Sequence, residues 1–394
     1  MKISLIQPSR NNLKYLKWSY DAIRKNQGDH NVQICVADDA STDGTWEWCM
    51  DMMEYDHNFA AIKNDGPERV GHTILYDRLV NEVAHHDICM IYHADMYLMP
   101  GALDQIEHKL EDKTIVSLTR IEPPLHPDGP EKMLMDFGVE PEEFKEEELL
   151  EWFKKVQLQQ LTKITEGIFA PWAFWKKDFQ EIGGHDPLYA PQSKEDSDIF
   201  NRFQLNGIKF KQTWGGCVYH MTCRGSRRNT VDKAKNIYED SPEWLAQNQR
   251  STRNFIRKWG HFVKHDTLMK PIIPPKYDIG IILPYNDIEL LRALEPWCNN
   301  IYCDSNLRQH YIITEQPNTI MDLHKRVLPF NNEKNNEILI TINEKFKQED
   351  FNNIVRLSEI LNVNGEKGEF ELDNLKIEVF QLNTYEKELI ICKK

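Results

Sequence analysis

The sequence lacks any apolar run long enough to cross a bilayer, since no uninterrupted stretch approaches the roughly 18 residues that a spanning helix needs. Its beginning, Met1 to Gln7, passes directly into a strand-like segment without the charged and then apolar order of a secretory signal. The eight cysteines are scattered, and Cys35, Cys89 and Cys303 lie in apolar runs where a reduced thiol packs as a small hydrophobe. We therefore expect a cytoplasmic protein without a transmembrane segment.

An excess of basic residues is also missing. The formal net charge is -14, which excludes a general nucleic-acid coat protein because phosphate neutralisation requires Lys and Arg in excess. One local exception leaves DNA as a possible partner: from Arg224 to Lys264 there are ten basic residues against four acidic ones. The basic residues are Arg224, Arg227, Arg228, Lys233, Lys235, Arg250, Arg253, Arg257, Lys258 and Lys264. No glycine-rich phosphate loop or Gly-X-Gly-X-X-Gly turn supports a kinase or a dehydrogenase.

A chain of 394 residues is long enough for two domains. Its first hundred residues alternate short apolar runs with helical patterns, such as Leu13 to Lys25 and Ile74 to Ala84. The strand-like runs are Ile3 to Gln7, Val32 to Ala37, Phe59 to Lys63 and Asp87 to Tyr92. Nearly continuous apolar strands joined by helices predict an α/β fold with a mostly parallel sheet covered by helices on both faces.

The rest of the chain divides at a change in composition. We expect one domain over residues 1–265 with an insertion at about 120–165, a proline-rich linker over 266–276, and a smaller α/β domain over 277–394. In the first domain we expect further strands at Gly167 to Trp172, Ile208 to Gln212 and Cys217 to Tyr219. The C-terminal domain has no catalytic cluster, so we expect it to serve acceptor docking or self-association. No internal repeat is visible in the sequence.

Metal-capable side chains stand where an apolar run ends in His93 and Asp95. Residues i and i+2 of an extended segment point to the same side, so this imidazole and this carboxylate can bind one cation. His220 ends another apolar run and is a candidate third ligand. Two imidazoles and one carboxylate favour manganese over magnesium, which prefers oxygen ligands. A zinc site from Cys217, His220 and Cys223 is less favoured because i, i+3 positions of a strand do not share a face.

Carboxylate pairs mark two further positions. Asp38 and Asp39 follow the second strand, where ligands bind beyond the carboxyl ends of a parallel sheet. A helix cap near Ser41 or Thr42 does not explain both carboxylates, whereas a nucleobase N–H or a ribose hydroxyl would satisfy them. Glu195 and Asp196 open a predicted helix, and an ionised carboxylate in a pocket is a suitable general base.

Several motifs occur in the order typical of one family. They are ISLIQPSRN, VADDASTDGT, HAD with a proline five positions later, EIGGHDPLY and KEDSDIFNR. In these motifs the first 265 or so residues resemble family 2 glycosyltransferases of the GT-A fold. The appended C-terminal region lies outside the family core and is similar to that of phage-encoded relatives.

The resemblance implies roles for particular residues. Asp196 of the Glu195-Asp196 motif would deprotonate the acceptor, and Asp95, with His93 in place of the family's first aspartate, would hold the metal on the diphosphate. The residues implied to bind the nucleotide-sugar are Pro8, Ser9, Arg10, Asp38, Asp39, Arg69, Asp95 and Arg224. Those implied to lie beside the acceptor are Gly183, Gly184, His185, Asp186 and Trp172, with Trp172 and Trp175 stacking on sugar faces or packing in the core.

The resulting expectation is a metal-dependent, inverting glycosyltransferase that uses a nucleotide-sugar, with UDP-sugars favoured. A glycan or lipid-linked glycan is the preferred acceptor, and a modified base in phage DNA is the alternative. A sugar nucleotidyltransferase and a non-catalytic sugar-binding scaffold are the other classes left open. The first would release pyrophosphate from a nucleoside triphosphate.

Overall fold

The computed structural model describes residues 1–222 and 240–392. The chain forms two compact units. The first unit comprises Met1–Ala246, His265–Ile272 and Ile391–Lys394, and the second comprises Gln247–Lys264 and Ile273–Ile390. The segment 247–264, which we expected in the first domain, thus packs with the second unit. No helix within the described ranges is both long and apolar enough to span a membrane.

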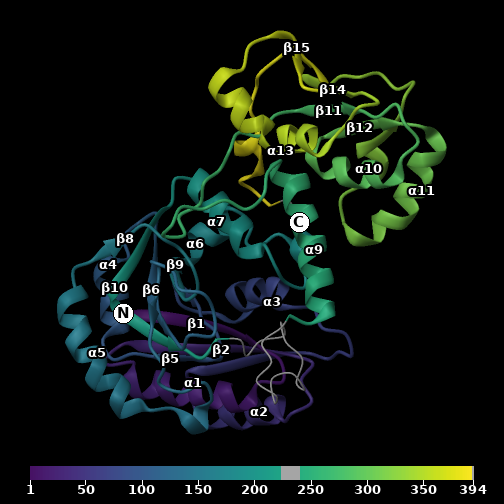
Figure 1. The fold of residues 1–394 in the computed structure, drawn as a ribbon. Helices are drawn as coiled ribbons and strands as arrows, with labels where there is room; N and C mark the ends of the chain where they lie inside the picture. The colour runs from purple at the N-terminus through teal and green to yellow at the C-terminus, as the bar shows by residue number, and fades with distance from the viewer. Residues whose placement is uncertain (223–239, 393–394) are drawn as a thin grey trace. The chain divides into compact units, whose positions relative to one another are not determined.

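The first unit is built on a ten-stranded sheet with the main order β3-β2-β1-β4-β9-β6-β10-β5 (Figure 1). The strands on this path are β1 (Lys2–Ser9), β2 (Asn31–Asp39), β3 (Phe59–Asn64), β4 (Ile88–Ile91), β5 (Met96–Leu98), β6 (Thr114–Glu122), β9 (Trp172–Trp175) and β10 (Lys209–His220). β7 (Met133–Leu134) pairs with β6, and β8 (Ile164–Thr165) pairs with β10. β1 to β4 are mutually parallel, whereas β5 and β9 run antiparallel to their neighbours. The predicted mixed, mostly parallel sheet is confirmed.

Helices flank this sheet, as predicted (Figure 1). They are α1 (Leu13–Asn26), α2 (Thr45–Tyr55), α3 (His72–Arg78), α4 (Ala102–Lys109), α5 (Glu146–Gln160), α6 (Lys176–Glu181), α7 (Glu195–Leu205) and the start of α9 (Pro242–Trp259). Short 3-10 turns are η2 (Pro141–Glu143) and η3 (Pro187–Tyr189), and α3 continues as a π-helical turn, η1 (Leu79–Val83). The predicted strand over Gly167 to Trp172 begins only at Trp172, because Pro171 has no N–H to donate to a ladder.

The predicted insertion is an ordered part of the core. Its helix α5 buries Leu149 and Phe153 in a cluster with Tyr15 of α1 and with Tyr97 and Tyr219 of the sheet. Burying aromatic and aliphatic side chains in this way stabilises the fold mainly by removing apolar surface from water. The insertion therefore covers the sheet beside β5 and β10. His220 is the last residue of β10 and lies opposite Met96, the first residue of β5.

The second unit contains a six-stranded sheet with the order β13-β12-β11-β14-β16-β15. Its strands are β11 (Ile279–Ile282), β12 (Asn300–Cys303), β13 (Val327–Pro329), β14 (Ile338–Ile342), β15 (Gly368–Leu372) and β16 (Leu375–Val379). Its helices are α10 (Ile288–Leu294), α11 (Ser305–Glu315), α12 (Leu323–Arg326) and α13 (Gln348–Asn364), with 3-10 turns η4 (Glu295–Trp297), η5 (Gln316–Asn318) and η6 (Glu386–Leu389).

The second sheet repeats the topology of the first. In each, the third, second, first and fourth strands are adjacent and parallel, and an antiparallel strand follows the fourth. The first strands also read alike, ISLIQP at residues 3–8 and IGIILP at residues 279–284, and each precedes a helix. The two sheets thus share a strand order that the sequence did not predict.

Buried charges hold α9 in the second unit. Arg257 is 2% exposed and donates to both oxygens of Glu295, at distances of 2.7 to 3.1 Å. Arg253 donates to Glu315 at 2.9 Å, and Arg326 donates to Glu295 at 2.8 Å. Two of the ten basic residues that suggested DNA binding are thus paired inside a unit. Arg224, Arg227, Arg228, Lys233 and Lys235 lie outside the described residues.

Candidate active site

The carboxyl end of β4 and the end of β10 bring three metal-capable side chains together. One ligand atom from each of His93, Asp95 and His220 lies within 4.8 Å of the other two. His220 Nε2 is 3.4 Å from Asp95 Oδ1. The backbone holds this arrangement, because β5 after the turn pairs antiparallel with β10 and places His220 opposite Met96. The contact that the sequence predicted across more than a hundred residues is therefore present.

The electrostatics of the cluster suit a cation. Burial lowers the pKa of His93 to about 4, so its imidazole is neutral near pH 7 and keeps a lone pair for a metal. Burial opposes ionisation of Asp95, yet His220 and His93 hold the pKa of this carboxyl below its usual range. Although burial opposes it, Asp95 and Glu122 raise the pKa of His220 to about 9, so a cation that binds here would displace a proton from this ring. Neutral imidazole and carboxylate are ligands that a borderline cation such as manganese accepts.

Glu122, at the end of β6, is a residue of this site that our sequence reading missed. It is 1% exposed, and its Oε1 lies 2.8 Å from His220 Nδ1. Lys132 donates to Glu122 Oε2 at 3.1 Å, and Arg120 lies 3.4 Å from Oε1. The signal was available, because Glu122 ends an apolar strand-like run as Asp39 does.

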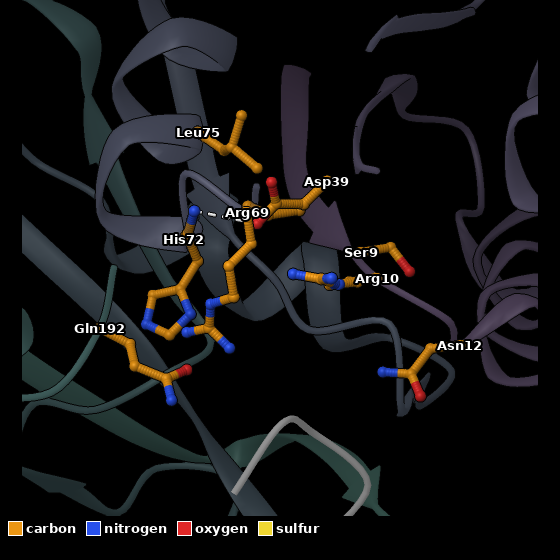
Figure 2. A pocket seen from close by; sticks show the side chains of 10 residues that line it. Ser9, Arg10, Asn12, Asp39, Arg69, His72, Leu75 and Gln192 are labelled. Atoms are coloured by element: carbon orange, nitrogen blue, oxygen red, sulfur yellow. Dashed lines mark hydrogen bonds between the residues drawn. The ribbon is translucent and has the colours of Figure 1, made fainter. Parts of the chain in front are cut away.

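A cavity opens beside the ends of β1 and β2 (Figure 2). Its lining residues are Pro8, Ser9, Arg10, Asn12, Asp39, Arg69, Gly71, His72, Leu75 and Gln192. Asp39 accepts hydrogen bonds from the Val70 and Gly71 amides, both at 2.9 Å, and from Asn64 at 2.8 Å. It thereby fixes the loop that carries Arg69 and His72. Of the predicted nucleotide-binding residues, Pro8, Ser9, Arg10, Asp39 and Arg69 meet in this cavity.

Two predicted binding residues are placed differently. Asp38 is fully buried, and its Oδ1 accepts from the Ser41 amide at 3.1 Å, so it shapes the turn after β2 and does not line the cavity. Arg224 lies outside the described residues. The expected cap at Ser41 or Thr42 is also absent, because Gly44 stands at the helix N-terminus and Asp43 accepts from Thr45.

The Glu195-Asp196 pair opens α7 beside the same cavity. Glu195 is 5% exposed, and its Oε1 is 2.6 Å from Nε2 of the cavity residue His72. Although burial opposes it, the Glu195 charge raises the pKa of His72, which favours an imidazolium paired with a carboxylate. Burial and the charge of Glu195 raise the pKa of Asp196 to about 6. The sequence analysis did not predict a role for His72, because its partner Glu195 is 123 residues away and no local motif indicates the contact.

A buried tyrosine shows that these groups share one region. Burial and the charges of Asp196, Glu195 and Asp95 together raise the pKa of Tyr76 well above its usual value. The charges of the candidate base and of the metal-capable carboxylate thus both bear on Tyr76, whose ring centroid lies 5.5 Å from that of His72.

The Gly183-Gly184-His185-Asp186 segment is held by buried contacts. His185 is 1% exposed, and its Nδ1 and amide nitrogen lie 2.8 and 3.0 Å from Asp77 Oδ1. Asp186 accepts from the Leu188 amide at 3.0 Å and so caps η3. A side chain at Gly184 would clash with Asp77, which explains the glycine. These contacts position the loop before Glu195, and none of them shows an acceptor contact.

Burial decides between alternatives that the sequence left open at two positions. Trp172 is fully buried and packs against Phe174, Phe200 and Phe203, so its ring has no face available for a sugar. The zinc alternative fails because the Cys217 thiol belongs to the buried hydrophobic cluster and approaches the Trp214 carbonyl, away from His220. Cys223 lies outside the described residues.

The residues present fit both a divalent cation and a nucleotide. The cation fits the imidazole and carboxylate donors described above. For a nucleotide, Ser9 Oγ and Arg69 Nε are buried polar atoms without a hydrogen-bond partner, and both belong to cavity residues. Buried polar groups normally have partners, so an unpaired donor in a cavity wall is a natural ligand contact. Arg10, Arg69 and His72 give this wall positive charge, which suits phosphate.

A mostly parallel sheet with the site at its strand ends makes the first unit an α/β domain of the kind that binds ligands beyond the carboxyl ends of its strands. Residues 4–183 match the family described as glycosyl transferase family 2. This match agrees with the family that the motifs indicated and covers the first unit as far as Gly183. No curated protein sequence matches the chain significantly.

Solved glycosyltransferase structures are similar to the chain at low identity. GalNAc-T7 with UDP, GalNAc and Mn²⁺ matches 66% of this chain at 11% identity with a TM-score of 0.45. The mannosyltransferase PcManGT from Pyrobaculum calidifontis, in complex with GDP-Man and Mn²⁺, matches 65% at 14% identity with a TM-score of 0.41. TarS 1-349 of S. aureus matches 65% at 13% identity with a TM-score of 0.39. The matched parts are 51%, 69% and 74% of those chains, so this chain spans about half of GalNAc-T7.

Proposed function

We propose that the first unit transfers a sugar from a nucleotide-diphosphate sugar to a hydroxyl group of an acceptor. The observation that carries the proposal is the meeting of His93, Asp95 and His220 within 4.8 Å. The charges of Asp95, Glu195 and Asp196 also bear on Tyr76, and a cavity lined by Arg10, Arg69 and His72 lies beside the Glu195-Asp196 pair. Such a set offers metal ligands, phosphate-binding groups and a base in one place.

Donor binding is assigned to the cavity. Arg10, Arg69 and His72 line the wall that would face the diphosphate, while Asp39 holds the loop of Arg69 and His72 in place and offers an acceptor to the nucleobase. We favour a UDP-sugar. His93, Asp95 and His220 would hold the divalent cation, with Mn²⁺ favoured over Mg²⁺ because two of the three ligands are imidazoles. When bound, the cation supplies Lewis-acid stabilisation of the leaving diphosphate.

Asp196 is assigned as the general base. With its pKa near 6, the carboxylate is mostly ionised at pH 7 and still basic enough to accept a proton from an acceptor hydroxyl. The hydroxyl oxygen then forms the new bond to the anomeric carbon as the bond to the diphosphate breaks, which inverts the configuration. Glu195 is paired with His72, so it supports the site and is not the base.

The preferred acceptor is a glycan or lipid-linked glycan. Fewer basic side chains are available for DNA phosphates than the sequence suggested, because Arg253 and Arg257 are paired with Glu315 and Glu295. Binding to DNA would weaken steeply with salt, whereas recognition of a neutral glycan would not. Comparing acceptor affinity at about 50 and 200 mM salt separates these two classes of acceptor.

The proposal is tested by measuring nucleoside diphosphate release from a panel of UDP- and GDP-sugars with Mn²⁺. We expect release by the wild type and its loss in Asp95→Asn. Asp112→Asn is the matched control, since Asp112 is exposed and pairs only with a surface lysine. Absence of release with every donor by a folded wild type would refute the proposal. Release of pyrophosphate from a nucleoside triphosphate would instead identify a nucleotidyltransferase.

A further inference from the structure

We infer that Glu122 is a positioning residue that fixes His220 for metal binding through Nε2, and that the 123–145 segment holds Glu122 in place. The inference rests on the proposed function, because it assigns a role toward the same cation. It starts from the buried contact between Glu122 Oε1 and His220 Nδ1 at 2.8 Å. Asp95 Oδ1 lies on the opposite side of the ring, 3.4 Å from Nε2.

The direction of this contact decides which nitrogen faces the cation. An ionised carboxylate only accepts hydrogen bonds, so Nδ1 must carry the proton that it donates to Glu122. Nε2 is then the nitrogen that binds a metal, beside Asp95 and His93. Carboxylate partners of this kind fix the ring orientation and the tautomer of metal-binding histidines, and their loss costs about 10- to 100-fold in metal affinity.

Glu122 is itself held in place by the 123–145 segment and by its neighbour Arg120. Lys132 is nearly buried and donates to Glu122 Oε2 at 3.1 Å, while Arg120 lies 3.4 Å from Oε1. Backbone pairing supports the arrangement, because β7 pairs with β6 and places Leu134 opposite Glu122. Both oxygens are therefore engaged, and the carboxylate stays ionised and fixed. Glu122 and Lys132 thus position His220, although neither residue belongs to the motifs that contain His93 and Asp95.

The test is a Mn²⁺ titration of metal-free protein, with free Mn²⁺ followed by electron paramagnetic resonance. We expect Glu122→Gln to bind Mn²⁺ about 10- to 100-fold more weakly than the wild type, because an amide holds either tautomer of His220. Glu131→Gln is the matched control: Glu131 lies 3.7 Å from the same Arg120, and its described ion pair does not involve His220. Equal Mn²⁺ affinity of Glu122→Gln and wild type would overturn the inference. No Mn²⁺ binding by the wild type would instead refute the metal site.

A second measurement needs no variant. Nitrogen-15 NMR of the wild type with a diamagnetic divalent cation reports which nitrogen of His220 carries a proton. We expect a protonated Nδ1 and a metal-bound Nε2, whereas a metal-bound Nδ1 would overturn the inference even if Glu122→Gln did not fold. A merely structural ion pair would change the unfolding temperature of Glu122→Gln and leave its Mn²⁺ affinity unchanged.

Discussion

Asp196 is a carboxyl group whose burial and whose neighbour Glu195 both oppose its ionisation. With a pKa near 6, Asp196 is protonated and inactive as a base below this pH and ionised above it. We therefore expect kcat/KM to rise with pH through about 6 on its acid limb. Asp196→Asn should lower kcat about 10²- to 10⁴-fold while donor affinity is retained. Rate profiles and nucleotide titrations check both expectations.

A substitution of Glu195, the neighbour of Asp196, predicts the direction in which the acid limb of the pH profile moves. Glu195→Gln removes the charge that, after burial, contributes most to the raised pKa of Asp196. The loss of charge on His72 acts in the opposite direction but ranks below Glu195. The acid limb should therefore move to lower pH in Glu195→Gln. An unmoved limb would mean that Asp196 is not the group that titrates.

At the scale of elements, α7 is anchored by one buried arginine. Arg202 donates to Asp198 at 2.7 Å and to the carbonyl oxygens of Ile182 and Gly184 at 3.0 and 2.6 Å. Both charged side chains are fully buried. Arg202→Met should lower the free energy of unfolding of the first unit by about 3 to 5 kcal/mol, because it leaves a buried carboxylate without its cation.

Urea unfolding followed by circular dichroism measures this loss. Arg78→Met is the control, because Arg78 forms an exposed pair with Glu82 one turn away, and such pairs contribute less than about 1 kcal/mol. Similar losses in the two variants would contradict the anchoring role of Arg202. Asp198→Asn in the Arg202→Met background should recover part of the stability, since the buried charge is then removed.

The loop before α7 depends on a glycine for its space as well as for its backbone. Gly184 has φ +68°, and a Cβ there would lie 2.2 Å from Asp77 Oδ2. Gly207 has φ +79° with no atom within 4 Å of a Cβ. Gly184→Ala should thus cost clearly more stability than Gly207→Ala, whose cost is only the backbone strain of about 1 kcal/mol. Thermal unfolding compares them, and equal losses would show that Asp77 moves aside freely.

The elements show what a single sequence can predict. β1 to β4 and the cluster of His93, Asp95 and His220 were predictable, because apolar runs end in polar residues at the same edge of a parallel sheet. The pairing of His72 with Glu195 was not, since it depends on how a loop folds over the edge. The choice between a core and a sugar-stacking role for Trp172 was not predictable either, because its neighbours in space, Phe200 and Phe203, are about 30 residues away along the chain.

At the scale of the whole molecule, the two sheets share a topology but not a metal site. Ser4 of β1 pairs with Cys89, four residues before His93. Gly280 of β11 pairs with Leu339, four residues before Asn343. Asn343 and Lys345 therefore occupy the positions of His93 and Asp95, and a lysine repels a cation. Among the described residues, the metal-capable clusters lie only in the first unit.

The second unit should fold only if it includes its part of α9. Glu295 is fully buried and loses Arg257 when the chain is cut near Pro274, although it keeps Arg326. Ile256 also leaves the apolar core of this unit. We expect a fragment of residues 247–390 to unfold cooperatively in urea and a fragment of residues 274–390 to be about 3 to 5 kcal/mol less stable or unfolded.

Far-UV circular dichroism and urea midpoints of the two fragments measure this difference. Arg257→Met in the longer fragment should reproduce much of the loss, because it leaves the same carboxylate buried with fewer cations. Adding both Glu295→Met and Arg326→Met should restore stability, since apolar side chains in contact then replace the whole buried group of ion pairs at little cost. Equal midpoints for the two fragments would mean that α9 contributes nothing to the second unit. In that case the division between the units would fall at the proline-rich segment, where the composition of the sequence changes.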